Sequence, residues 1–213
     1  MAETSITPAQ RIALWADKLR DMSAMGLHFS KDIYDQQRYR DIQTMAMEMH
    51  ALASGDSFSQ IEPLRDTVYA PPMPLVGASA FVFDGVRVLL IRRADDKKWA
   101  LPGGGLEVGE TPAQGAQREV MEESGVQCRV TKLVGLFDSR HIGWQSRYHV
   151  YHCVFACEPV ADADEVSPTH ALEILDKAWF DADKLPTDLS GGHALFIAEA
   201  FRVWRGGEPY FDH

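Results

Sequence analysis

The sequence predicts an α/β protein in which a small helical region precedes a mixed β-sheet with helices packed on its faces. Residues 7–54 carry apolar side chains at helical spacing. After Pro71 the pattern changes to short apolar runs rich in β-branched and aromatic residues. A glycine-rich loop followed by a capped helix interrupts these runs. The 213 residues fit one large domain, or one domain with an appendage.

The first helix is predicted to begin at Thr7, because Thr-Pro-Ala-Gln combines an N-cap, a proline at the first helical position and a glutamine three residues after the cap. Gly26 and the polar stretch 30–32 are expected to break it. A second helix is predicted over Asp35–Leu52. Trp15 and the methionines of the second helix form an adaptable apolar surface, which fits either the core of the chain or a dimer interface.

The proline-rich stretch 70–74 predicts a stiff linker. We therefore place a domain boundary near Pro71, with a helical module in residues 1–70 and a second domain in residues 71–213. In the second domain, strands are predicted at 76–83, 86–91, 129–137, 148–157 and 174–180, and helices at 112–124 and 193–204. Asp84-Gly85 is a two-residue hairpin signal between the first two strands.

Composition argues against several classes of protein. The net charge is −10 and no run of basic residues occurs, which argues against a surface for duplex nucleic acid. The three cysteines do not form a disulfide framework or a zinc pattern. No signal peptide and no membrane-spanning stretch is recognisable, so a cytoplasmic location is the expectation.

Three glutamates crowd the end of the predicted helix 112–124, namely Glu119, Glu122 and Glu123. Each costs about 0.3–1 kcal/mol at a helix C-terminus, where the helix dipole is negative. An exposed pair of Arg118 with Glu122 would contribute only about 0.3–0.5 kcal/mol. A solvated acidic helix end is the simple interpretation. The clustering of three carboxylates next to the loop Gly103–Gly105 favours a divalent cation instead, Mg2+ or Mn2+.

The same segment resembles the Nudix box, G-x5-E-x7-R-E-U-x-E-E-x-G-U, where U is a bulky aliphatic residue. Every specified position is filled, by Gly104, Glu110, Arg118, Glu119, Val120, Glu122, Glu123, Gly125 and Val126. Nudix enzymes hydrolyse the pyrophosphate of a nucleoside diphosphate linked to another group and use divalent metal. The resemblance implies an α/β/α sandwich from about residue 76 to residue 204.

By the same resemblance, the three helix glutamates and the main-chain carbonyl of Gly104 are metal ligands. Arg118 orients a glutamate, and Glu110 supports the site without binding metal directly. The general base in this family is a glutamate of the box or of a later loop. Glu173 is our candidate and Glu165 is its rival, although either could be a solvated loop residue.

Substrate-binding candidates lie in two places. Arg92, Arg93, Lys97 and Lys98 could reach phosphates, although such a charge run is more often a solvated turn. The segment 139–152 gathers Arg140, His141, Arg147, His149, Tyr151 and His152, with Trp144 and Tyr148 able to stack on a base. Arg92, Arg140, His141 and Tyr148 are the predicted substrate contacts.

The N-terminal residues carry a second resemblance. LWADKLR and the segment 26–39 look like the helical module of CDP-choline pyrophosphatase-like Nudix proteins, which implies a homodimer and cleavage of CDP-choline. Leu106 departs from the pattern, because an aromatic residue often follows the glycine pair there. The predicted substrate is therefore a nucleoside diphosphate derivative of the CDP-choline or ADP-ribose type.

Two alternatives stay open at this point. A Nudix-fold sensor would bind nucleotides without turnover, but sensors usually show an eroded box and a basic DNA-binding appendage. Processing of RNA ends would need a basic groove, and the acidic composition argues against one.

Overall fold

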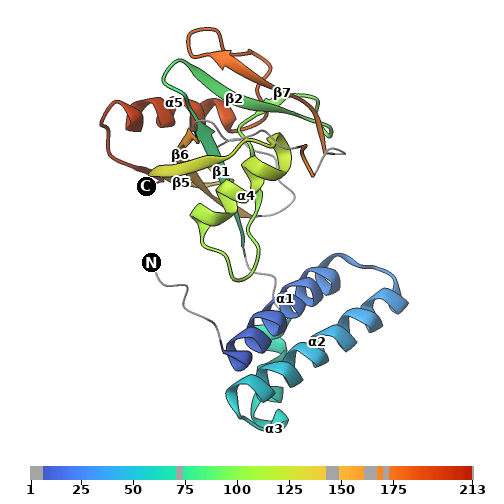
Figure 1. The fold of residues 1–213 in the computed structure, drawn as a ribbon. Helices are drawn as coiled ribbons and strands as arrows, with labels where there is room; N and C mark the ends of the chain where they lie inside the picture. Colours follow the sequence, from blue (N-terminus) through green and yellow to red (C-terminus); the bar gives the residue numbers. More distant parts are fainter. Residues whose placement is uncertain (1–6, 71–73, 143–148, 161–166, 170–172, 213) are drawn as a thin grey trace. The chain divides into compact units, whose positions relative to one another are not determined.

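The computed structural model describes residues 7–70, 74–142, 149–160, 167–169 and 173–212. The chain divides into two compact units (Figure 1). The first comprises residues 1–73 and 107–109, and the second comprises residues 74–106 and 110–213. Within the described ranges, no helix is both long enough and apolar enough to cross a bilayer.

Unit 1 is helical. Its elements are α1 (Pro8–Phe29), α2 (Ile33–Ser54), α3 (Phe58–Ile61), a 3-10 turn (Glu62–Leu64) and a π-helical turn (Arg65–Tyr69). Helices α1 and α2 lie side by side (Figure 1). The predicted capping box at Thr7 is present, because Thr7 Oγ1 accepts from the Gln10 N–H and Gln10 Oε1 accepts from the Thr7 N–H.

The prediction that Gly26 breaks the first helix is wrong, because α1 continues through it to Phe29. A Cβ at Gly26 would lie 2.3 Å from ring carbons of Tyr39 on α2. This glycine therefore permits close approach of two helices, and the helix ends instead where Ser30 adopts an extended backbone. Asp32 then caps α2, since its carboxylate accepts from the N–H groups of residues 34 and 35.

The apolar residues of unit 1 are shared between a small core and the surface. Met47 is fully buried together with Ala46, and Tyr69 packs against them. Met45 and Trp15, in contrast, are each 53% exposed. Part of the apolar surface predicted for these helices is therefore not used inside the unit.

Unit 2 contains two sheets and two helices. Its elements are β1 (Leu75–Val82), β2 (Arg87–Arg93), β3 (Trp99–Ala100), β4 (Gly103–Gly105), α4 (Pro112–Ser124), β5 (Cys128–Asp138), β6 (Val150–Pro159), β7 (Ile174–Asp181), α5 (His193–Trp204) and β8 (Tyr210–Phe211). A five-stranded mixed sheet has the order β4-β1-β6-β5-β8, with β1–β6 and β5–β8 parallel. A three-stranded antiparallel sheet has the order β3-β2-β7.

Successive side chains along β1 point to opposite faces of the mixed sheet and contribute to a hydrophobic cluster on each face. Phe81 and Phe83 pack with Phe196 of α5 in one cluster. Ala78, Ala80 and Val82, which point the other way, pack with Val120 of α4 in a second cluster. The mixed sheet is therefore covered by α5 on one face and α4 on the other, which confirms the predicted α/β/α sandwich (Figure 1).

The turn predicted at Asp84-Gly85 forms between β1 and β2, but the two strands do not pair along their length as a hairpin. Gly85 has φ +97°, and Asp84 accepts from the N–H groups of Val86 and Arg87. Only the bridge Phe83–Val88 joins the two strands, after which β1 and β2 enter different sheets. The hairpin predicted from Asp84-Gly85 is thus limited to its turn, because β1 pairs with β6 and β2 pairs with β7.

Candidate active site

Helix α4 carries two of the three glutamates toward the interior. It begins at the predicted capping box of Thr111 and ends at Gly125, which has φ +71°. Glu119 and Glu123, one turn apart, are only 7% and 5% exposed. Glu122, which lies on the neighbouring part of the helix surface, is half-buried.

The glycine-rich loop lies directly against these carboxylates. Gly103–Gly105 pairs as the short strand β4 with residues 77–79 of β1. The Gly103 N–H donates a 2.8 Å hydrogen bond to the Glu123 carboxylate. A Cβ at Gly104 would lie 2.5 Å from Glu119 Oε1, so only glycine allows the backbone this close. The loop and the acidic helix therefore form one site.

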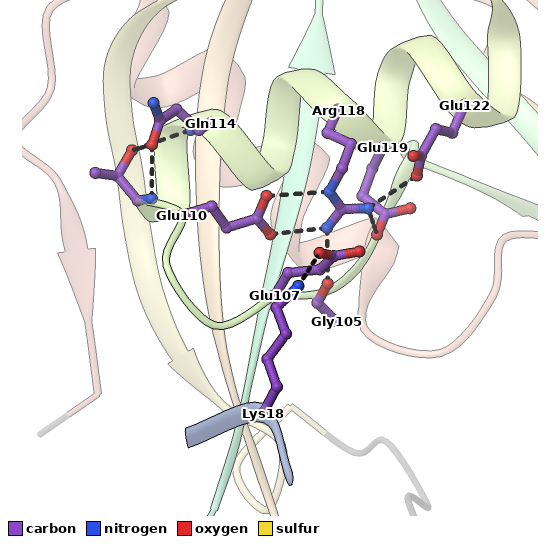
Figure 2. A network of polar contacts seen from close by, with 9 residues as sticks. Lys18, Gly105, Glu107, Glu110, Gln114, Arg118, Glu119 and Glu122 are labelled. Carbon is purple, nitrogen blue, oxygen red and sulfur yellow. Dashed lines mark hydrogen bonds and ion pairs between the residues drawn. The ribbon is translucent and has the colours of Figure 1, made fainter. Parts of the chain in front are cut away.

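Arg118 connects the carboxylates to one another (Figure 2). Its Nε and Nη2 donate to both oxygens of Glu110, at 3.0 and 2.8 Å. Its Nη1 donates to Glu119 at 2.9 Å and to Glu122 at 2.8 Å. Nη2 also donates to the Gly105 carbonyl at 3.0 Å. One guanidinium thus fixes three carboxylates and the loop.

The sequence predicted an ion pair of Arg118 with Glu122, and the resemblance added that Arg118 orients a glutamate; the pair with Glu122 is present but partly buried. The Arg118 side chain is only 23% exposed and binds Glu110, Glu119 and Glu122 at once. The hydrogen bonds to Glu110, with those to Glu122 and Glu119, raise the pKa of Arg118 above its usual value. Such bidentate, partly buried pairing is stronger than an isolated surface ion pair.

A pocket of about 580 Å³ opens beside this cluster. Glu119, Glu123 and Glu173 line it together with Arg93 and the loop Gly103–Gly105. Glu173 is exposed and immediately precedes β7. Its carbonyl accepts a 2.8 Å hydrogen bond from the Ala94 N–H, which brings this part of the chain beside the end of β2. The structure therefore brings together carboxylates that lie 50 residues apart in the sequence.

Burial raises the pKa of Glu123 to about 8, with further contributions from the negative charges of Glu119 and Glu173. The hydrogen bond from Gly103 and the charge of Arg93 oppose this shift. Glu123 therefore resists ionisation unless positive charge enters the pocket.

Nudix hydrolases generally use divalent metal ions, and the donors of this pocket fit such an ion. Carboxylate and carbonyl oxygens are the ligands of Mg2+ and Mn2+, and a buried carboxyl with a raised pKa needs a positive partner. Within the described residues, no three acidic, histidine or cysteine side chains are already arranged around one metal position.

The other predicted residues lie in different places. Arg92 donates to the Lys97 carbonyl and does not line the pocket of about 580 Å³. Arg140 pairs with Asp138, and with His141 it lines a separate pocket of about 360 Å³ that shares no residue with the glutamate pocket. Tyr148, Trp144, Arg147 and Glu165 lie outside the described residues.

Sequence reasoning did not select Arg93, although its side chain lines the pocket. Alternation could not separate it from Arg92, because the pairing of β2 with β7 shifts its register between these two residues. Such an irregularity re-aims side chains and leaves no mark in a single sequence.

Arg118→Lys should weaken Mn2+ binding about 10–100-fold, because an ammonium cannot hold three carboxylates and the Gly105 carbonyl in one plane. Calorimetric titration with Mn2+ measures this change in affinity. Arg129→Lys is the matched control, since Arg129 forms a single exposed pair with Glu158. If Arg118→Lys and the parent bound Mn2+ with equal affinity, Arg118 would not be needed to position the carboxylates.

The raised pKa of Glu123 predicts a pH-dependent stability in the absence of metal. The folded pKa is about 8 and the ordinary value is 4.5, so the folded state holds its proton more tightly than the unfolded state. The free energy of unfolding should therefore fall as pH rises from 4.5 to 8, by about 1.4 kcal/mol per pH unit at most.

Glu123→Gln keeps an oxygen that can accept from Gly103 but cannot ionise. Urea unfolding in chelator at several pH values should show this variant gaining stability over the parent across that window. Glu158→Gln, which changes an exposed carboxylate, is the control. A constant difference between Glu123→Gln and the parent at all pH values would contradict the prediction.

Comparison with known proteins agrees with this geometry. Residues 73–200 match the NUDIX domain, and residues 10–64 match a UDP-X-like N-terminal oligomerisation domain. A putative ADP-ribose pyrophosphatase of Bacillus subtilis (strain 168) is 33% identical over 172 residues, which is 80% of this chain and 81% of that protein.

Solved structures show the same relationship. A UDP-X diphosphatase has a TM-score of 0.58 and 26% identity, and the match covers 95% of this chain and 98% of that one. An ADP-ribose pyrophosphatase from Streptococcus suis, with a TM-score of 0.54 and 24% identity over 65% of this chain and 97% of that one, shares the fold. The chain, with its complete box, its sandwich and its helical N-terminal region, belongs to the Nudix family of hydrolases.

Proposed function

We propose that this chain is a divalent-metal-dependent pyrophosphohydrolase. It cleaves a nucleoside diphosphate linked to another moiety, of the CDP-choline or ADP-ribose type, to a nucleoside monophosphate and a phosphorylated product. The observation that carries the proposal is that Glu119, Glu123 and Glu173 line one pocket with the glycine loop. The names of the relatives, an ADP-ribose pyrophosphatase and a UDP-X diphosphatase, support this class of substrate.

The size and charge of the pocket suit such a substrate. A volume of about 580 Å³ lies within the range of roughly 300–1,000 Å³ typical of small-molecule sites. Its carboxylates would repel a pyrophosphate in the absence of a cation. Arg93 is the basic side chain that lines it within the described residues, and we propose that it contacts a phosphate.

Glu119, Glu122, Glu123 and the Gly104 carbonyl would hold Mg2+ or Mn2+. The bound cation supplies charge neutralisation at the pyrophosphate and acidifies a water molecule. The chain itself supplies the positioning. Arg118 bridges Glu119 and Glu122 through its Nη1 and fixes their orientation, and the Gly103 N–H orients Glu123.

We assign the general base to Glu173. It is exposed at the pocket and makes none of the Arg118 contacts that restrain the helix glutamates. In this role Glu173 takes the proton of the attacking water, the water oxygen bonds to one phosphorus, and the bridging P–O bond breaks. The leaving phosphate carries the released electron pair.

The N-terminal unit supports a homodimer. Trp15, Met45 and Leu52 of α1 and α2 are 53%, 53% and 71% exposed. Residues 10–64 match an oligomerisation domain, and a second copy of the chain would cover this apolar surface. Light scattering should therefore give twice the mass of one chain, and a monomeric mass at micromolar concentration would contradict the proposal.

The function is tested by phosphate-product release from a panel of substrates. The panel contains CDP-choline, ADP-ribose, a sugar nucleotide, a dinucleoside polyphosphate and a nucleoside triphosphate, each with Mg2+, Mn2+ or chelator. We expect metal-dependent turnover of a diphosphate derivative, with kcat lowered at least about 100-fold in Glu122→Gln. Glu158→Gln should behave as the parent. Tight binding of one compound without turnover of any would favour a sensor instead.

The same assay tests the general base. Glu173→Gln should lower kcat by about 100–10,000-fold and change KM little, because the residue acts on water rather than on the substrate. Glu165→Gln tests the rival. Loss of kcat in Glu165→Gln together with a normal kcat in Glu173→Gln would transfer the role to Glu165.

A further inference from the structure

A second pocket, of about 270 Å³, adjoins the pocket of the glutamates. The two share Arg93 and the loop Gly103–Gly105 in their linings, so they lie next to each other. The rest of the second pocket comes from the starts of β1, β6 and α5, and its lining residues there are Leu75, Val76, Gly77, Ser79, Val150, His152 and His193. This lining is largely apolar, with two imidazoles among it.

His193 is held rigidly at this wall. It is the first residue of α5 and only 6% exposed. Its Nδ1 accepts a 3.1 Å hydrogen bond from the Leu101 N–H, and its ring packs edge-on against Phe196 at 5.3 Å between centroids. The imidazole therefore has a fixed position and links α5 to the segment that leads into the glycine loop.

The hydrogen bond to Nδ1 also fixes the tautomer. Burial lowers the pKa of His193 to about 3, so the ring is neutral at ordinary pH. Since Nδ1 accepts from Leu101, the single ring proton is on Nε2. Among the described residues, no acceptor is bonded to this Nε2–H. The pocket thus presents a buried, preoriented donor from His193 beside its apolar side chains.

We propose that His193 determines which nucleobase the enzyme accepts, by donating its Nε2–H to a carbonyl oxygen of a keto-bearing base bound in the second pocket. The inference rests on the proposed function, since it places the base of the same substrate whose pyrophosphate lies among the glutamates. The pocket of about 270 Å³ has room for a nucleobase.

A donor of this kind discriminates because it cannot become an acceptor. A ligand that offers a carbonyl oxygen satisfies it, whereas one that offers an amino group there leaves two donors facing each other. Sites built around a buried hydrogen bond reject analogues that lack the partner far more strongly than apolar pockets reject a changed volume. Uracil and guanine carry the required oxygen at the edge opposite the ribose, whereas adenine and cytosine carry an amino group there. The inference therefore narrows the proposed class of nucleoside diphosphate derivatives to those of uracil or guanine.

The experiment holds the second moiety constant and changes the base. Initial rates are measured with UDP-glucose, GDP-glucose and ADP-glucose in Mg2+. We expect kcat/KM for at least one keto-bearing substrate to exceed that for ADP-glucose about tenfold or more. Equal values for all three would overturn the inference. Absence of turnover with every substrate, here and in the larger panel, would instead contradict the proposed hydrolase.

Two variants separate the donor from the structural link. His193→Asn keeps an oxygen near the position of Nδ1 to accept from Leu101 but removes the Nε2–H. His193→Gln keeps an N–H near Nε2 but loses the acceptor for Leu101. The ratio of kcat/KM for the keto-bearing substrate to that for ADP-glucose should fall at least about fivefold in His193→Asn and stay near the parent value in His193→Gln.

A purely structural role for His193 gives a different pattern. Both substrates would then lose rate together, and the ratio would be unchanged in His193→Asn, which would overturn the inference. His28→Asn, which changes an exposed histidine of α1, serves as the control for the substitution. Thermal unfolding of each variant confirms that the rates compare folded proteins.

Discussion

The site depends on one guanidinium. Glu119, Glu122 and Glu123 lie near the C-terminal end of α4, where the helix dipole and mutual repulsion both disfavour negative charge. Arg118 offsets this by binding Glu110, Glu119 and Glu122 together with the Gly105 carbonyl. Because the guanidinium is planar and its donors are fixed, it also sets the angles at which those carboxylates stand. The same contact therefore stabilises the fold locally and prepares the site.

The neutralisation is incomplete, and this incompleteness is functional. Among the described residues, Arg118 is not paired with Glu123, whose buried carboxyl has a pKa raised to about 8 and accepts a hydrogen bond from the Gly103 backbone. The protein thus keeps a carboxyl that is unfavourable as an anion until a cation arrives. In the proposed function, stability is given up at the place where the metal and the pyrophosphate would bind, as is common at functional sites.

The two pockets divide the recognition of a substrate between different physical interactions. In the proposed function, the carboxylates would hold the cation that binds the pyrophosphate and Arg93 would add positive charge, while the neighbouring pocket would provide an oriented donor from His193. The loop Gly103–Gly105 lines both, and His193 binds Leu101 just before that loop. Binding of the base and alignment of the reacting phosphates are therefore connected through a short, rigid segment of backbone.

The sequence by itself determined the local elements and the chemistry of the box. Residue spacing alone predicts the capping boxes at Thr7 and Thr111 and the bounds of α4 and α5. It also predicts that Glu119, Glu122 and Glu123 lie together, because all of these features depend on residues a few positions apart. Tertiary structure decided what depends on distant pairing. It placed β1 and β2 in different sheets, made Gly26 a contact for Tyr39 rather than a helix stop, and selected Arg93 over Arg92 through a register shift. It also brought Glu173 to the glutamates and His193 to the second pocket, since neither residue carries a local signal for the strand or helix end that it meets in space.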